Sequence, residues 1–327
     1  MGDESKPAAA EPSRAGRTPR RLFYVGSIMF AVAAALWFGA ATVVSRRLKY
    51  PEFPAGGRGD VHGVHVPKLA ADADPHNAFG ADFKTVKIDG AGGGDSAAGW
   101  FIPASDSSTA VLLLPPSGAS RAAMLPYAKF LHAANFAVLT IDSGDTPGAA
   151  TDWGVRESGR ALSAADWLKG RGFKTVAALG VSEGAAAALF AQAKRPVFAA
   201  IVADSSYDNL GAMLRRTPSV AGLNSAFVAT VMYAAALRLG GDPVFVSPAK
   251  AAARLGGARV MIIQNRGDEL TPRSDGLALL AMSGSATRMW NAPSNGHGDA
   301  IFAAPDQYAA RVTMFLNQAL TGKSPAQ

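Results

Sequence analysis

From residue 82 onward, short apolar runs alternate with segments of helical pattern. The central apolar runs, such as residues 110–114 and 136–141, are continuous rather than alternating. Continuous runs are typical of parallel strands that helices cover on both faces. The pattern therefore predicts a doubly wound, mostly parallel α/β sheet. Strands are expected at 83–88 and 98–102, as a hairpin, and at 110–114, 136–141, 175–179, 198–203, 259–264 and 287–290, with helices at 121–134, 155–170, 183–193, 273–282 and 305–320.

The alternation stops between residues 205 and 250, which predicts a small helical cap insert. Its main helix is expected at 224–239, between Pro218 and Gly240. An insert at this point of the chain would lie over the carboxyl ends of the strands, where open α/β sheets bind ligands. Four side chains of this helix either line an apolar pocket or form plain core: Phe227, Met232, Tyr233 and Leu237.

Residues 22–45 contain no charged side chain, and arginine pairs stand on both sides of them. As a helix, this run is long enough to cross a bilayer core of about 30 Å. A cleaved signal peptide would have a shorter apolar region followed by small residues, whereas this run ends at Arg46 and Arg47. We therefore expect an uncleaved transmembrane anchor rather than a signal peptide or a buried soluble helix. The flanking charges give a slight preference for a cytoplasmic N-terminus and an exported domain.

The rest of the chain is divided by composition. Residues 1–21, rich in Ala, Pro, Ser and Arg, are expected to be a disordered basic tail, and the proline-rich residues 46–81 a tether. Residues 82–327 then form the α/β domain. The tether holds His62, His65 and His76, but no acidic or cysteine partner follows at ligand spacing, so solvated loop histidines are favoured over a metal site.

Charge and cysteine content exclude several classes of function. The net charge is +7, but the first 50 residues contribute +5 of it, with 8 Lys and Arg against 3 Asp and Glu. The α/β domain has no basic stripe interleaved with aromatic residues, so nucleic acid is not an expected partner. The chain has no cysteine, which excludes disulfides, thiol catalysis and cysteine-ligated zinc.

The chain has one Gly-x-Ser-x-Gly motif, from Gly180 through Ser182 to Gly184, between an apolar strand and an alanine-rich helix. A serine at such a turn adopts a strained conformation that requires small neighbours, and its hydroxyl projects above the sheet. The following helix presents free N–H groups and the positive end of its dipole. These features predict a nucleophile at Ser182; the alternative is an ordinary strand-to-helix turn.

A nucleophilic serine needs a base and a group that orients the base. Only one of the five histidines follows Ser182, namely His297 in a loop after the last strand, and it is the expected base unless it is a plain surface residue. Asp268, just after strand 259–264, is the expected orienting acid, with capping of the next helix as the alternative. Asp204 is the reserve candidate.

Acyl transfer also needs donors for the developing oxyanion. The backbone N–H of Glu183, directly after the nucleophile, is the first expected donor. The second should come from the loop after strand 110–114. Because Pro115 and Pro116 have no N–H, it must come from Ser117 or Gly118.

With Ser182, Asp268 and His297 in this order, the chain resembles the α/β-hydrolase superfamily, and more narrowly bacterial membrane-anchored hydrolases related to serine aminopeptidases and acylaminoacyl peptidases. The resemblance covers about residues 82–320. It includes the motifs at 99–103 (Gly-Trp-Phe-Ile-Pro), 154–157 (Gly-Val-Arg-Glu), 203–206 (Ala-Asp-Ser-Ser) and 247–248 (Ser-Pro). The chain departs from the pattern of that group at Pro115–Pro116, Glu183 and Arg160.

The resemblance implies a membrane-anchored serine hydrolase that cleaves a small-molecule ester or amide through an acyl-enzyme, without a metal or an organic cofactor. Esters are favoured over peptides because no acidic cluster that would hold a substrate amino group stands out. The alternative is a catalytically silent α/β-hydrolase scaffold that binds a ligand or a partner at the membrane.

Overall fold

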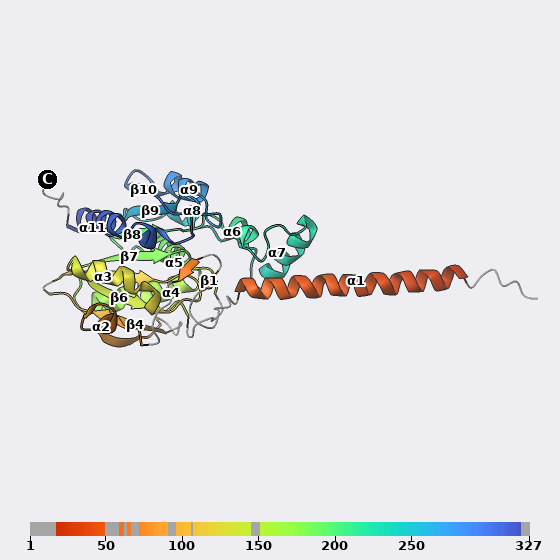
Figure 1. Cartoon of the computed structure of the whole chain (residues 1–327), viewed down its shortest axis with the longest axis horizontal. Helices are drawn as coiled ribbons and strands as arrows, with labels where there is room; N and C mark the ends of the chain where they lie inside the picture. Colours follow the sequence, from red (N-terminus) through yellow and green to blue (C-terminus); the bar gives the residue numbers. More distant parts are fainter. Residues whose placement is uncertain are drawn as a thin grey trace, which may run out of the picture.

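The computed structural model describes residues 18–49, 59–61, 64–66, 72–90, 96–105, 107–144 and 151–321. Its centre is an eight-stranded sheet of order β10-β9-β8-β7-β5-β6-β4-β3 (Figure 1). Strand β4 pairs antiparallel with β3 and β6, and every other pair is parallel. The predicted mostly parallel α/β sheet is confirmed. The strands are β3 (Lys84–Ile88), β4 (Ala97–Ile102), β5 (Thr109–Leu114), β6 (Ala137–Ile141), β7 (Thr175–Val181), β8 (Ala200–Asp204), β9 (Arg259–Asn265) and β10 (Thr287–Ala292).

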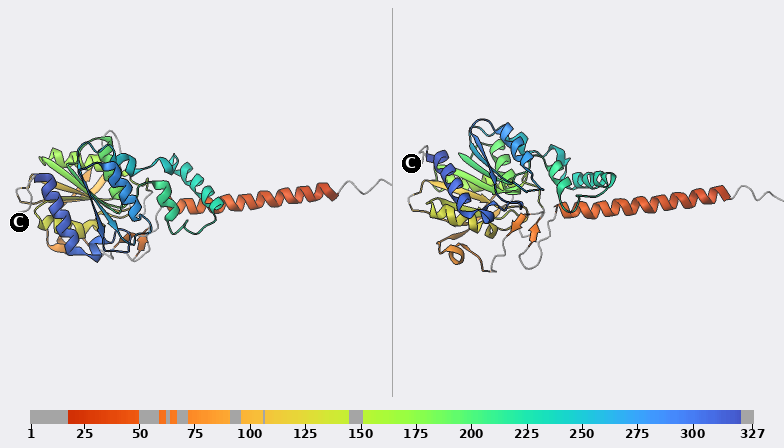
Figure 2. Two further views of the ribbon diagram at one scale, coloured as in Figure 1. Left: turned by 90° about the horizontal axis from the view of Figure 1, so that it is seen from above. Right: turned by 45° about the horizontal axis from the view of Figure 1, so that its top comes forward.

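Helices cover both faces of the sheet, as the continuous apolar strands require (Figure 2). Strand β5 shows the division, because Leu112 points into one core and Leu113 into the other, and both are fully buried. The first core is covered by α4 (Glu157–Gly170), α5 (Glu183–Lys194), α8 (Pro248–Ala252) and α9 (Arg273–Ser283). The second is covered by α3 (Leu125–Ala133), α10 (Ala300–Ala303) and α11 (Pro305–Thr321).

The predicted tether contains elements that its composition did not indicate. A short antiparallel pair joins β1 (Gly59–Val61) to β2 (Val64–Val66), and helix α2 (Pro75–Phe79) follows. Asp74 begins α2 by accepting a hydrogen bond from the backbone N–H of Asn77 at 2.7 Å, and Gly80 ends it in a left-handed conformation. The predicted helix at 121–134 begins as a 3₁₀ turn, η3 (Arg121–Met124). Most of the expected basic tail, residues 1–17, and His62 lie outside the described residues.

The cap insert consists of α6 (Leu210–Arg216), α7 (Ser225–Leu239) and η4 (Pro243–Phe245). Val228, Val231 and Met232 of α7 are buried in a third apolar cluster at the base of the cap. The prediction that Tyr233 and Leu237 line a pocket or a core is wrong, because these side chains are 63% and 68% exposed. They lie one helical turn apart on the opposite face of α7.

Helix α1 (Thr18–Lys49) extends away from the α/β domain as one long rod (Figure 1). Its segment Leu22–Leu48 is long and apolar enough to cross a membrane, with a mean hydropathy of 2.0, and is almost entirely exposed. Membrane anchors and N-terminal signal sequences share this length and composition. The half of α1 nearer to the domain packs beside α7 (Figure 2).

Candidate active site

Ser182 stands between β7 and α5 in a conformation that few L-residues adopt. Its φ is 54° and its ψ is −114°. A Cβ added to Gly180 would lie 2.3 Å from the backbone of Gly184, and one added to Gly184 would lie 2.2 Å from the carbonyl oxygen of Leu114. Both glycines are therefore required by close backbone approaches, and the strained turn is held by the packing around it.

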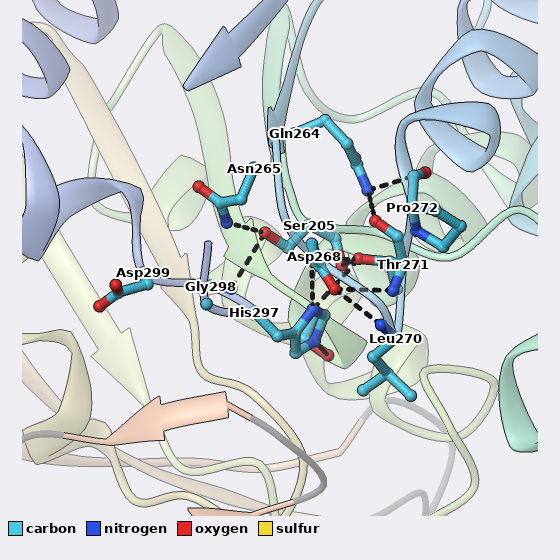
Figure 3. A network of polar contacts seen from close by, with 12 residues as sticks. Ser205, Gln264, Asn265, Asp268, Leu270, Thr271, Pro272, His297, Gly298 and Asp299 are labelled. Carbon is cyan, nitrogen blue, oxygen red and sulfur yellow. Dashed lines mark hydrogen bonds and ion pairs between the residues drawn. The ribbon is translucent and has the colours of Figure 1, made fainter. Parts of the chain in front are cut away.

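The structure brings the three predicted side chains together. His297 Nε2 lies 2.9 Å from Ser182 Oγ. On the other side of the ring, His297 Nδ1 lies 2.7 Å from Asp268 Oδ2, as Figure 3 shows. All three residues are at most 7% exposed. A carboxylate only accepts hydrogen bonds, so Nδ1–H donates to Asp268 and Nε2 is left to accept from the serine hydroxyl. This tautomer is the one that a general base acting on the serine requires.

Asp268 keeps its negative charge although it is buried. Burial alone would raise the pKa of Asp268, but the adjacent His297 ring and hydrogen bonds from His297 and Thr271 outweigh it and hold the pKa below its ordinary value. The backbone N–H groups of Leu270 and Thr271 donate to Oδ1 at 3.0 and 2.8 Å, and the Thr271 hydroxyl donates to Oδ2 at 2.7 Å. Asp268 thus closes its own turn with one oxygen and faces His297 with the other. It does not cap α9, which begins after Pro272 without a side-chain cap.

The loops that carry Asp268 and His297 are fastened to each other. The N–H of Gly267 donates to the carbonyl oxygen of Ser294 at 3.0 Å, and that of Arg266 donates to the carbonyl of Ala292 at 3.2 Å. A Cβ on Gly267 would lie 2.6 Å from Asn295 Oδ1, so the contact leaves no room for a side chain. The acid and the base are therefore held at a fixed separation by backbone contacts between their loops.

Asp204, the reserve acid, lies beneath the site and does not hydrogen-bond to His297 among the described residues. Its side chain accepts from Ser205 Oγ at 2.9 Å and from the hydroxyl of Tyr308 at 2.8 Å, and its carbonyl oxygen accepts from the N–H of Ser182 at 2.8 Å. Complete burial raises the pKa of Asp204 to about 6. Its contacts are those of a residue that supports the turn rather than one that orients the base.

Ser205 links Asp204 to the histidine loop, a role that the sequence did not indicate. Its hydroxyl oxygen accepts from Asn265 Nδ2 at 3.0 Å and from the N–H of Gly298 at 3.2 Å (Figure 3). Ser205 has a φ of 52°, a second strained serine beside the first. The sequence also gave no indication that Thr271 donates to Asp268. A threonine three residues after an aspartate is the signal that could have indicated a turn closed by the aspartate side chain.

The predicted oxyanion donors lie in two tight turns. Glu183 is the first residue of α5, so its N–H has no acceptor within the helix. Residues 116–119 form a turn closed by the N–H of Ala119 and the carbonyl of Pro116 at 3.0 Å. Gly118 has a φ of 65° at the position of that turn where glycine is favoured. Ser117, beside it, is 2% exposed.

The Glu183 side chain is buried directly beneath these donors. Its Oε2 accepts from the Thr151 hydroxyl, whereas Oε1 and the hydroxyl of the nearby Ser117 have no hydrogen-bond partner among the described residues. Burial raises the pKa of Glu183 well above its ordinary value, and the nearby Glu157 carboxylate raises it further, against hydrogen bonds that lower it. Either a proton on Oε1 that is donated to Ser117, or a Ser117 hydroxyl that donates to an ionised Oε1, would satisfy both of these atoms.

Glu157 is fixed by the loop that precedes α4. Its Oε2 accepts from the N–H of Gly154 at 2.9 Å, and burial raises its pKa. Arg160, which lies on the same helix, donates to the carbonyl of Ser143 at 2.5 Å. A small cavity with room for about one water molecule lies among Leu114, Pro115, Glu157, Arg160 and Glu183.

No group of three or more His, Cys, Asp or Glu residues suited to a metal ion occurs in the part of the chain that the structure describes. His76 lies in α2 and His132 in α3, and neither contacts Ser182, Asp268 or His297 by a hydrogen bond.

No protein-family model matches the chain, and no curated protein has a matching sequence. Among solved structures, the chain is similar to the Pyrococcus furiosus esterase Pf2001, with a TM-score of 0.63 and 23% identity over 78% of this chain and 97% of the esterase. It is also similar to a puromycin-hydrolyzing peptidase of Mycobacterium tuberculosis, with a TM-score of 0.60 and 16% identity over 80% of this chain and 42% of the peptidase.

The Pyrococcus horikoshii acylaminoacyl peptidase is a third such structure, with a TM-score of 0.58 and 11% identity over 76% of this chain and 43% of the peptidase. The chain thus spans less than half of the two peptidases. Together with the strand order, these similarities show that the chain has the α/β-hydrolase fold. The esterase and the two peptidases share that fold with it at 11–23% identity.

Proposed function

We propose that this protein is a serine hydrolase that cleaves an ester or an amide through an acyl-enzyme. The proposal depends on one observation, the continuous contact from Ser182 Oγ through the His297 ring to Asp268. Ser182 attacks the substrate carbonyl while His297 Nε2 takes its proton, and the ionised Asp268 stabilises the resulting imidazolium. His297 then protonates the leaving group. Water, activated by the same ring, releases the acyl group from Ser182.

The tetrahedral intermediate carries a negative oxygen that needs donors already in place. The N–H of Glu183 is the first donor, and that of Ser117 or Gly118 is the second. The tight turn at Gly118 and the burial of Ser117 support a loop whose geometry is fixed before substrate binds. Asp204 serves as a support for the turn, not as the triad acid.

A fluorophosphonate probe tests the chemistry, since it reacts with an activated serine. We expect labelling of the full-length protein and its loss in Ser182→Ala, whereas Ser163→Ala, a matched buried serine on α4, should still be labelled. A folded protein that resists the probe would favour the silent scaffold instead. A panel of p-nitrophenyl esters and aminoacyl anilides separates esterase from peptidase activity, and we expect the esters to be cleaved faster.

We further propose that α1 anchors the protein in a membrane and is retained. Its C-terminal half contacts the folded domain through side chains, including hydrogen bonds from Trp37 to Thr230 and from Arg238 to Ser45. A signal sequence that is cleaved would leave these partners uncovered. Retention of the first 49 residues in membranes washed with alkaline carbonate, checked by mass spectrometry, tests this proposal; a mature chain that begins after Lys49 would contradict it.

A further inference from the structure

Helix α7 runs parallel to the C-terminal half of α1 and is fastened to it at two levels. At the first level, Trp37 Nε1 donates to Thr230 Oγ1 at 3.0 Å, and the Trp37 ring packs edge-on against Phe227 with centroids 5.0 Å apart. At the second level, Arg238 donates from Nε to Ser45 Oγ at 2.9 Å. Trp37 and Ser45 are eight residues apart, which is about 12 Å along a helix. The start of α7 thus lies deeper along the predicted span than its end.

Neither helix carries a charge along the stretch where the two run side by side, up to the level of Arg46 and Arg238. Residues 22–45 of α1 and residues 217–237 of the cap contain no Asp, Glu, Lys, Arg or His. Arg46 and Arg47 follow directly after residue 45 of α1. Arg238 follows directly after residue 237 of α7 and donates a hydrogen bond to Ser45. The arginines therefore mark one level, beyond which α7 carries no charge and α1 carries none until Arg21.

The exposed face of α7 is apolar, which is unusual for a helix in contact with water. After the exposed first residue, Ser225, it consists of Ala226, Ala229, Tyr233 and Leu237, spaced three or four residues apart. The polar groups at the deeper level are already paired, because the Trp37 N–H bonds to Thr230 and the Thr230 hydroxyl donates to the carbonyl of Ala226 at 3.1 Å. Internal pairing of this kind is what a hydrocarbon environment requires.

From these observations we propose that the α6–α7 cap is seated in the lipid bilayer beside α1. The proposal rests on the membrane anchor proposed above. Ser225, the first residue of α7, lies 13 residues before Arg238, which is about 20 Å along a helix and less than a bilayer core of about 30 Å, so the cap enters the bilayer and does not cross it. The lipid surface covers the stripe from Ala226 to Leu237.

This position also specifies a class of substrate. The buried face of α7 packs in the same apolar cluster as Leu270, whose N–H donates to Asp268 at 3.0 Å. A continuous apolar cluster therefore joins the cap, which the proposal places in the bilayer, to the loop that carries Asp268. The substrates that fit are esters or amides of long acyl chains that partition into a membrane.

Because the chain has no cysteine, single cysteines can be introduced for an environment-sensitive fluorophore. We would label Leu223→Cys and Tyr233→Cys in the full-length protein reconstituted in phosphatidylcholine nanodiscs. Met314→Cys, an exposed apolar residue on α11, is the matched control, and Phe30→Cys reports on the anchor. Nitroxide-labelled lipid should quench the labels at 223, 233 and 30, and iodide should quench the label at 314 several-fold more strongly than those three.

Two outcomes would overturn the seated cap while leaving the anchor intact. In both outcomes, nitroxide-labelled lipid quenches the label at 30. In the first, iodide quenches the labels at 223 and 233 as strongly as the label at 314, which means that water covers the face. In the second, neither lipid nor iodide quenches the labels at 223 and 233, which means that protein covers the face. If lipid does not quench the label at 30, the anchor fails and the seated cap fails with it. Loss of fluorophosphonate labelling would remove the hydrolase function and the substrate class that rests on it, and would leave the seated cap untouched.

The substrate class is tested with the double variant Tyr233→Lys, Leu237→Lys, whose positions are exposed and outside the catalytic machinery. We expect hydrolysis of a long-chain p-nitrophenyl ester dispersed in nanodiscs to fall about tenfold or more, with hydrolysis of p-nitrophenyl acetate unchanged. Met314→Lys should change neither rate. The assigned substrate class would be overturned if the double variant hydrolysed both esters as fast as the natural sequence. It would also be overturned if the double variant lost activity equally on both esters.

Discussion

Replacing Glu183 with glutamine tests whether this buried residue carries a proton. Glutamine keeps an acceptor for Thr151 and supplies an N–H donor for Ser117, so Glu183→Gln reproduces the hydrogen bonds of the neutral acid. Burial, followed by the field of Glu157, raises the pKa of Glu183 well above its ordinary value. A group whose pKa is raised by folding contributes its full stability below the pKa of the unfolded chain and loses it as pH rises toward the folded pKa.

The unfolding free energy of the natural sequence should therefore fall relative to that of Glu183→Gln once pH exceeds the ordinary glutamate value of 4.5. The difference grows by about 1.4 kcal/mol for each pH unit up to the raised pKa. For a domain of this size that corresponds to roughly 3–6 °C in Tm per pH unit. Taking the difference between the two proteins removes the contributions of buried acids that do not act on Glu183, such as Asp204, because both proteins contain them.

The assay is thermal unfolding of both proteins in the same detergent from pH 5 to 8. Glu269→Gln is the matched control, because Glu269 is an exposed glutamate in the Asp268 loop. Its melting curves should stay parallel to those of the natural sequence. If the curves of Glu183→Gln also stay parallel across this range, Glu183 ionises like an ordinary glutamate, and the shared proton with Ser117 is refuted.

Two further substitutions test the site. Asp268→Asn should lower kcat by roughly 10⁴-fold with little change in melting temperature, because the amide no longer holds the His297 tautomer; a loss below tenfold would exclude Asp268 as the triad acid. Gly184→Ala should lower the unfolding free energy by roughly 2–4 kcal/mol, because its Cβ would lie 2.2 Å from a backbone oxygen. Gly159→Ala is the control, because no atom lies within 4 Å of its added Cβ, and it should raise the unfolding free energy by about 0.5–1 kcal/mol. If both substitutions changed the unfolding free energy equally, the close approach at Gly184 would be contradicted.

The parts of the site that the sequence predicts are those encoded locally. The strained turn at Ser182 follows from two glycines at fixed spacing, and the loop positions of Asp268 and His297 follow from the strand–helix alternation. A parallel sheet brings the carboxyl ends of its strands to one edge, so three distant loops were expected to meet there. The contacts of 2.9 and 2.7 Å agree with that expectation.

The missed parts depend on contacts between distant segments. Glu183 pairs with Thr151, 32 residues away, and Trp37 pairs with Thr230, 193 residues away. Nothing in the local pattern of either segment specifies its partner. Tyr233 and Leu237 illustrate the same limit, because an apolar side chain on a helix predicts burial, but the sequence alone does not say whether protein or lipid covers it.

The residues that fix the oxyanion side of the site also fix the cap. Thr151 donates to Glu183, and the Thr151 hydroxyl in turn accepts from the N–H of Trp153 at 2.9 Å. The carbonyl of Trp153 accepts from the hydroxyl of Tyr207, which is fully buried in the cluster at the base of the cap. This chain of hydrogen bonds joins the first turn of α5 to the segment that leads into α6. The cap and the turn that follows Ser182 are therefore one packed unit, and a bilayer that holds the cap also holds the orientation of the catalytic edge toward the membrane.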